Sequence, residues 1–82
     1  TRLFVHEKIH DKVVEGVAAV AKSFKPGPGL DPAHDFGPLI SEKQRERVAG
    51  FVEAGRKEGA EVVCGGKAPS RAGWFYEATV LT

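Results

Sequence analysis

A Gly-Pro turn followed by a capped helix constrains the fold of this chain more than any other stretch. In residues 35–40, the Gly-Pro pair turns the backbone and two apolar residues pack inward after it. Ser41 then opens a capping box: its side chain bonds the Gln44 amide, and the Gln44 side chain reaches back to the Ser41 amide. Gly59 suits the left-handed residue that ends many helices. The sequence therefore predicts a turn and then a helix from Ser41 to the region of Gly59.

This helix is expected to carry one apolar face. The face contains Val48, Phe51, Val52 and Gly55. On the polar side, Glu53 and Lys57 form a favourable pair at positions i and i+4. Gly50 lies in the helix interior, where glycine costs about 1 kcal/mol relative to alanine. We therefore expect another stretch of backbone to pass close to Gly50.

A second helix is predicted upstream. From Ile9 onward, apolar residues recur at steps of three and four, which is typical of a helix with one apolar stripe. The stripe comprises Ile9, Val13, Val14, Val17, Val20, Ala21 and Phe24. Pro26 ends this helix because its ring clashes with the preceding turn. Residues 25–35 are rich in proline and glycine and predict a long surface loop.

Three short runs are typical of strands. Residues 3–5 are apolar, residues 61–64 end at a Gly-Gly pair, and residues 74–81 combine aromatic and β-branched side chains. The element order is β-α-α-β-β. It predicts an α/β fold of one domain, residues 1–82, with two helices packed on a small mixed sheet. Trp74, Phe75 and Tyr76 could form a binding patch, but an aromatic run in a strand favours the core.

The charge balance excludes several classes of partner. Twelve basic and eleven acidic residues are interspersed and give a net charge of +1, so no basic stripe follows a nucleic acid backbone. No apolar run approaches the roughly 20 residues needed to cross a membrane. The single cysteine excludes an internal disulfide and fits a reducing compartment. We therefore expect a cytoplasmic protein that binds neither nucleic acid nor membrane.

Cys64 is the obvious candidate nucleophile, but its setting argues against that role. It closes an apolar strand, whereas a reactive thiol lies exposed near positive charge or a helix start. We expect an inert, buried Cys64. The histidines predict no metal site, because His6, His10 and His34 have no third ligand at a usable spacing. The glycines beside Pro28 lack the third glycine and the following helix of a dinucleotide fingerprint.

Three segments together resemble one enzyme family. They are RLFVHEKIHDKVVEGV, DFGPLISEKQRERV and EVVCGGKAP, in this order. The set is similar to the catalytic domain of NAD(P)-dependent aldehyde dehydrogenases, along the whole chain but over only a slice of that family's enzyme. The resemblance implies oxidation of an aldehyde to a carboxylic acid with NAD or NADP, through a thiohemiacetal on a cysteine. It also implies that this cysteine lies just before Thr1 and that the general-base glutamate lies upstream.

The resemblance therefore implies no catalytic residue and no activity for residues 1–82 alone, which we expect to be a section of a longer chain. It implies a cofactor-binding role for Gln44 and Arg47, near the hydroxyls of the nicotinamide ribose. Arg47 stands where lysine is often seen, and it keeps the donor function but not its geometry. The alternative for both residues is structural: Gln44 completes the capping box, and Arg47 is a solvated helix residue.

A second hypothesis needs no catalysis. The chain opens and closes in strand-like runs whose faces lack neighbours, and bare apolar faces favour association. In this interpretation residues 1–82 are a structural or interaction module of α/β type that self-associates. We expect a homo-oligomer, with an aldehyde as the small-molecule partner of the parent enzyme.

Overall fold

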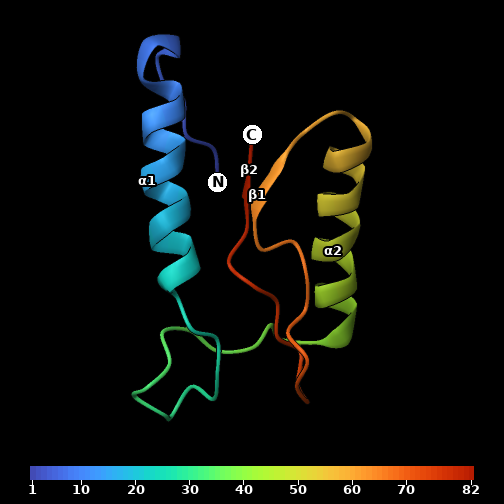
Figure 1. Ribbon diagram of the computed structural model, residues 1–82. Helices are drawn as coiled ribbons and strands as arrows, with labels where there is room; N and C mark the ends of the chain where they lie inside the picture. The colour runs from blue at the N-terminus through green and yellow to red at the C-terminus, as the bar shows by residue number, and fades with distance from the viewer.

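Two α-helices stand on opposite sides of a two-stranded sheet in the computed structural model, which describes residues 1–82 (Figure 1). In chain order the elements are a 3-10 turn at Glu7–Ile9, α1 at His10–Ser23, α2 at Glu42–Lys57, β1 at Val62–Cys64 and β2 at Val80–Leu81. The termini lie close together, since Thr1 and Thr82 line the same groove. The predicted α/β fold with two helices and a small sheet is confirmed.

The helix α1 begins where the sequence predicts, with Ile9 as its N-cap residue. It ends at Ser23, just before Pro26. Its apolar stripe is covered only in part. Ala18 is buried against the strands, whereas the exposed fractions of Ile9, Val20 and Phe24 are 51%, 56% and 47%. One side of α1 therefore presents apolar surface to solvent.

One of the two predicted bonds of the capping box at the start of α2 is formed. Ser41 Oγ accepts a hydrogen bond of 3.1 Å from the Gln44 amide, and Gly59 after the helix has a φ of 104°. The reciprocal bond from the Gln44 side chain is not formed, because this exposed side chain extends into solvent. The expected Glu53–Lys57 pair is also absent. Glu53 instead lies 3.8 Å from the Arg56 Nε at position i+3.

Two further expectations for α2 are wrong. Nothing lies within 4 Å of a Cβ built on Gly50, so no backbone passes close to it and the position faces solvent. Phe51 is 67% exposed, whereas Val52 is buried and Val48 and Gly55 are half-buried. The buried stripe is thus narrower than the apolar pattern, and Phe51 lies at its edge.

The sheet is antiparallel and smaller than predicted. Val62 pairs with Leu81 and Cys64 with Val80, with a bulge between these pairs. The run at 74–81 forms a strand only in its last part, at β2. Residues 3–5 pair with no strand, and Phe4 is 92% exposed, because a strand forms only where a neighbouring strand supplies hydrogen bonds. The expectation of a mixed sheet is therefore wrong, because the sheet is antiparallel and residues 3–5 do not join it.

The buried core is small and lies between the helices. It comprises Ala18, Val52, Cys64, Phe75 and Tyr76. Phe75 and Tyr76 confirm the expected core role of the aromatic run, while Trp74 remains 40% exposed. Gly65 permits the core to close, because its φ is +70° and a Cβ there would collide with the Ala78 carbonyl.

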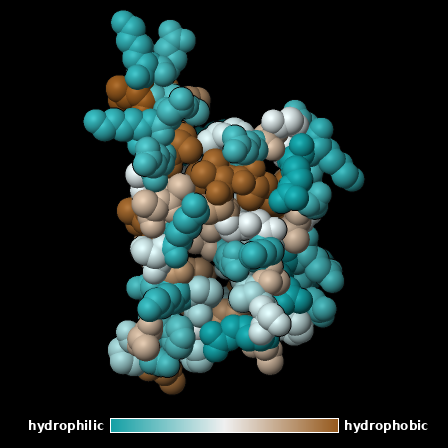
Figure 2. Space-filling view, in the orientation of Figure 1, coloured by the Kyte–Doolittle hydropathy of each residue, from teal (hydrophilic) through white to brown (hydrophobic).

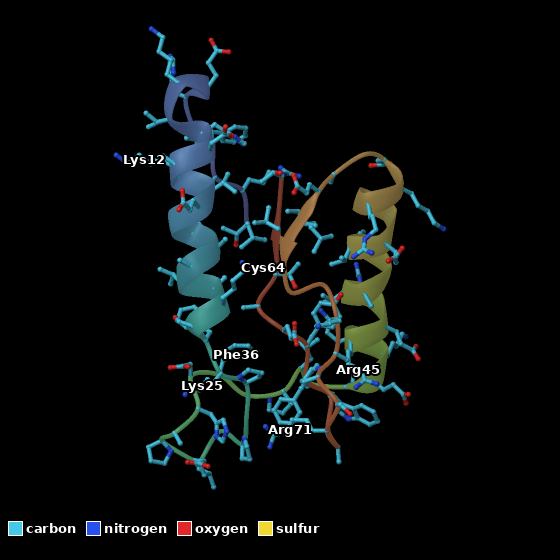
Figure 3. The ribbon with its side chains drawn as sticks, viewed as in Figure 1. Lys12, Lys25, Phe36, Arg45, Cys64 and Arg71 are labelled. Carbon is cyan, nitrogen blue, oxygen red and sulfur yellow. The ribbon has the colours of Figure 1, made fainter.

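Hydrogen bonds between Lys25, which is labelled in Figure 3, and Asp35 join the two ends of the loop between the helices. The Lys25 amide donates to Asp35 Oδ2 at 2.7 Å, and the Asp35 amide donates to the Lys25 carbonyl at 2.8 Å. Beside them, Phe24 and Phe36 form an edge-to-face pair with centroids 6.5 Å apart. The predicted loop is thus confirmed, and its two ends are joined.

Neither α1 nor α2 has the length and the apolar character that a membrane-spanning helix requires.

Candidate functional site

The two residues expected to bind a cofactor, Gln44 and Arg47, lie at positions i and i+3 in the first turns of α2. That spacing puts them on the same side of the helix. Both are exposed, and neither side chain forms a hydrogen bond within the chain. The Arg47 guanidinium lies over the Phe51 ring, with 5.9 Å between its Cζ and the ring centroid. Their donors are therefore available to a molecule that approaches this face.

The chemistry of this pair fits the hydroxyl groups of a sugar. A side-chain amide offers both a donor and an acceptor, and a guanidinium offers donors in a fixed fork. A diol presents both donors and acceptors, so it can pair with both kinds of group. The glycines beside Pro28 open no helix, and the His34 ring lies where a Cβ on Gly27 would be.

The start of α2 is attached to a loop that is distant in sequence. The Leu39 amide donates to the Trp74 carbonyl at 2.8 Å, just before the helix cap. From within the helix, Arg45 Nη1 donates to the Gly73 carbonyl at 3.2 Å, and Arg45 Cζ lies 5.3 Å from the Trp74 ring centroid. Nothing near Arg45 in the sequence indicates these partners, so its role is visible only in the structure.

A second arginine attaches the same loop on its other side. Arg71 Nη1 donates to the Pro26 carbonyl at 3.1 Å, and Arg71 Cζ lies 4.8 Å from the Phe75 ring centroid. In Figure 3, Arg45 lies at the lower end of α2 and Arg71 on the neighbouring loop. Residues 71–75 therefore connect α2 to the loop between the helices.

Cys64 lies in β1, between the two helices (Figure 3). It is 8% exposed, and its Sγ lies 3.9 Å from the Ala78 carbonyl oxygen. The expected buried thiol is confirmed. A nucleophile needs access to its substrate and a nearby base or positive charge, and Cys64 has neither.

The three histidines have local roles. His6 Nδ1 accepts a hydrogen bond of 3.1 Å from the Lys8 amide at the 3-10 turn. His10 lies 3.1 Å from Asp11 Oδ1, and His34 lies 3.2 Å from Asp31 Oδ2, each pair being neighbours in the same local segment. No three histidine, cysteine or acidic side chains converge on one point.

Tyr76 is a buried titratable group, and the sequence predicts only its place in the core. Burial raises the pKa of its phenol above the ordinary 10.0, and the Arg56 charge partly opposes this rise. Tyr76 lines a cavity of about 210 Å³ together with Arg45, Glu53 and Lys67. This cavity lies on the loop-facing side of α2.

A large, mostly apolar groove lies between the N-terminal segment, α1 and β2. It measures about 640 Å³, and its walls include Leu3, Val13, Val17, Val80 and Leu81. Figure 2 shows hydrophobic atoms gathered between the two helices on this face of the molecule. A patch of this kind marks a surface that other polypeptide can cover.

The chain matches known proteins along its whole length. The sequence model described as the aldehyde dehydrogenase family matches residues 1–82. The mitochondrial aldehyde dehydrogenase of Leishmania tarentolae is 43% identical over 82 residues, which is 100% of this chain and 16% of the relative. A succinate-semialdehyde dehydrogenase [NADP(+)] of Mycobacterium leprae is 42% identical over 81 residues, or 99% of this chain and 18% of the relative.

A solved structure agrees with these sequence matches. The NAD+ complex of an aldehyde dehydrogenase from Bacillus cereus superposes with a TM-score of 0.90 at 41% identity, over 95% of this chain and 16% of that one. The chain thus spans about a sixth of the length of the proteins that it matches.

Proposed function

Because the chain belongs to the aldehyde dehydrogenase family, we propose that it forms part of the catalytic domain of an enzyme that oxidises an aldehyde to a carboxylic acid with NAD or NADP. The nicotinamide cofactor supplies the hydride acceptor for this reaction. The nucleophile is a cysteine outside residues 1–82, since the one cysteine of the chain is buried in β1. Within this enzyme, residues 1–82 hold the cofactor and support the fold.

The observation that carries the proposal is the placement of Gln44 and Arg47. They share one exposed side of α2, and their side chains have no other hydrogen-bond partner. In our proposal Gln44 and Arg47 hydrogen-bond the hydroxyls of the nicotinamide ribose. Their task is to hold the ribose in place and so orient the nicotinamide toward the aldehyde. Arg47 supplies donors from a planar fork, so its contact differs in shape from that of a lysine.

A chimera tests this proposal directly. The host is the Bacillus cereus relative, with its matching segment replaced by residues 1–82. We expect the chimera to form NADH in the presence of aldehyde and residues 1–82 alone to form none. Turnover by residues 1–82 alone that disappears in Cys64→Ala would contradict the proposal.

Substitutions in the chimera test the two site residues. Gln44→Ala and Arg47→Ala each remove one hydrogen-bonding side chain, worth about 0.5–1.5 kcal/mol, so each should raise the KM for the cofactor about twofold to thirteenfold. Lys43→Ala is the matched control, because Lys43 is exposed on the same turn but points about 100° away from Gln44. An unchanged KM in both site variants would refute the ribose contact.

A self-associating module is the second candidate function, and one observation favours it. The chain exposes 6390 Å² of surface. A folded monomer of this mass exposes about 4,800 Å². The excess is about 1,600 Å², which exceeds the roughly 800 Å² that each partner buries in a standard interface. We propose that the apolar groove beside α1 and β2 takes part in such association.

The remaining expectations stay predictions. The relatives include enzymes named for betaine aldehyde and for succinate semialdehyde, so the family accepts several aldehydes. The cytoplasmic location and the homo-oligomer also stay predictions, and one relative is named as mitochondrial.

A further inference from the structure

We propose that Arg45 is a positioning residue, which fixes the first turns of α2 and thereby aims Gln44 and Arg47 at the cofactor. This inference rests on the proposed cofactor role of those two residues. Arg45 itself does not reach the cofactor-facing side, because its guanidinium is engaged with Gly73 and Trp74.

The helix α2 is held mainly at its ends and by loops. It makes few direct contacts with the strands, and Val52 is its only buried residue. Figure 1 shows α2 beside the long connection between β1 and β2. A helix attached in this way can pivot unless side chains near its start fix it. The hydrogen bonds that reach out from this start are those of Leu39 and Arg45.

Arg45 reaches from α2 to the loop at residues 71–75. It follows Gln44 directly, so it points about 100° away around the helix, toward the loop. It is half-buried, whereas Gln44 and Arg47 are exposed. Its guanidinium both donates to a carbonyl at 3.2 Å and lies on an aromatic face at 5.3 Å. Together these contacts fix the direction and the distance of the side chain, which a single contact would not do.

The loop at residues 71–75 is itself anchored. The buried Phe75 ring holds it beside Gly73 and Trp74, whereas Arg71 adds a separate bond to the Pro26 carbonyl and lies over the same ring. Arg45 therefore attaches α2 to a fixed point. Arg71 uses the same chemistry as Arg45, an arginine bond to a carbonyl and a contact with an aromatic ring. It does so at the far side of the loop, which makes it a matched control.

The test uses the chimera described above and compares Arg45→Met with Arg71→Met. We expect Arg45→Met to raise the KM for the cofactor about fivefold while kcat changes less than twofold, because the loss affects cofactor binding. Arg45→Lys keeps the charge but not the fork, so it should recover part of this loss. Arg71→Met should lower the melting temperature about as much as Arg45→Met does, but it should leave the KM for the cofactor unchanged. Equal rises in KM for both methionine variants, or none for Arg45→Met, would overturn the inference.

Hydrogen exchange of residues 1–82 supplies a readout that does not depend on activity. Arg45→Met should speed exchange of the Leu39 and Gln44 amides about tenfold relative to Arg71→Met, and unchanged exchange would overturn the positioning role. The two proposals can fail separately. If Gln44→Ala and Arg47→Ala leave the KM unchanged while exchange responds to Arg45→Met, the cofactor role fails and Arg45 still fixes the helix. If they raise the KM and Arg45→Met does not, only the positioning role fails.

Discussion

The Leu39 amide and the Trp74 carbonyl form a hydrogen bond of 2.8 Å that joins the Gly-Pro turn to the aromatic run. It connects two segments that are far apart in the sequence, at the place where α2 begins. The proposed cofactor contacts lie on the first turns after this bond. The site therefore depends on tertiary attachment as well as on the helix itself.

The cap of α2 should contribute measurably to stability. Ser41→Ala removes the bond to the Gln44 amide and should lower the free energy of unfolding by about 1 kcal/mol. For a chain of this size the melting temperature should then fall by about 4–8 °C in thermal denaturation. Ser70→Ala is the control, because Ser70 is exposed and its hydroxyl has no partner in the chain. Equal losses in the two variants would show that the cap does not stabilise the helix.

Alanine substitutions at two glycines should change the free energy of unfolding in opposite directions. Gly50 is exposed within α2 with open space around it, so Gly50→Ala should raise the free energy of unfolding by about 0.5–1 kcal/mol. Gly65 has a positive φ and lies against the Ala78 carbonyl, so Gly65→Ala should lower it by about 2 kcal/mol or more. Denaturant titration measures both. A loss of stability in Gly50→Ala would indicate that another backbone does pass close to Gly50, and it would contradict the open space seen there.

The stability of the fold should fall at alkaline pH through Tyr76. Burial raises its folded pKa above the ordinary 10.0, so the unfolded phenol loses its proton first as the pH rises. Above that pH the folded state binds more protons than the unfolded state, and stability decreases with pH until the folded phenol also ionises. Tyr76→Phe should remove this part of the pH dependence in melts that extend from neutral pH to above pH 10.0. Since Tyr76 is the only tyrosine, phenolate absorbance reports its ionisation directly, and parallel pH profiles for the two proteins would contradict the prediction.

The uncovered face of α1 should drive self-association. In sedimentation velocity we expect the average mass of residues 1–82 to rise with concentration. Val17→Ser removes an exposed apolar side chain from the groove beside α1 and β2 with little change in helix propensity, and it should shift the transition about tenfold higher in concentration. Leu30→Ser is the control, because Leu30 is fully exposed in the loop away from this face. A mass that stays monomeric at every concentration would refute the association.

The local features could be predicted because their partners are close in sequence. The Ser41 cap, the left-handed Gly59 and the end of α1 before Pro26 each depend on neighbouring residues. A glycine inside a helix can lie against another backbone or face open solvent, and the sequence does not distinguish these cases. The prediction of a close contact at Gly50 was wrong for this reason. The burial of Cys64 followed from its place in an apolar strand.

The remaining features depend on partners that the local sequence does not name. Residues 3–5 have strand composition, but no strand of the described chain pairs with them. Arg45 was missed because its partners, Gly73 and Trp74, come from a distant loop. The Gln44 and Arg47 assignment came from the resemblance, and the structure adds that both side chains are exposed on one side of α2.

The most direct test of the cofactor role compares NAD with an analogue that lacks the hydroxyls of the nicotinamide ribose. In the chimera, we predict that the analogue lowers kcat/KM about tenfold, whereas in the Gln44→Ala/Arg47→Ala variant it lowers kcat/KM less than twofold further. The effects of the analogue and of the double substitution are not additive, because each removes one partner of the same hydrogen bonds. If the analogue instead costs the variant the full tenfold, Gln44 and Arg47 do not contact the ribose.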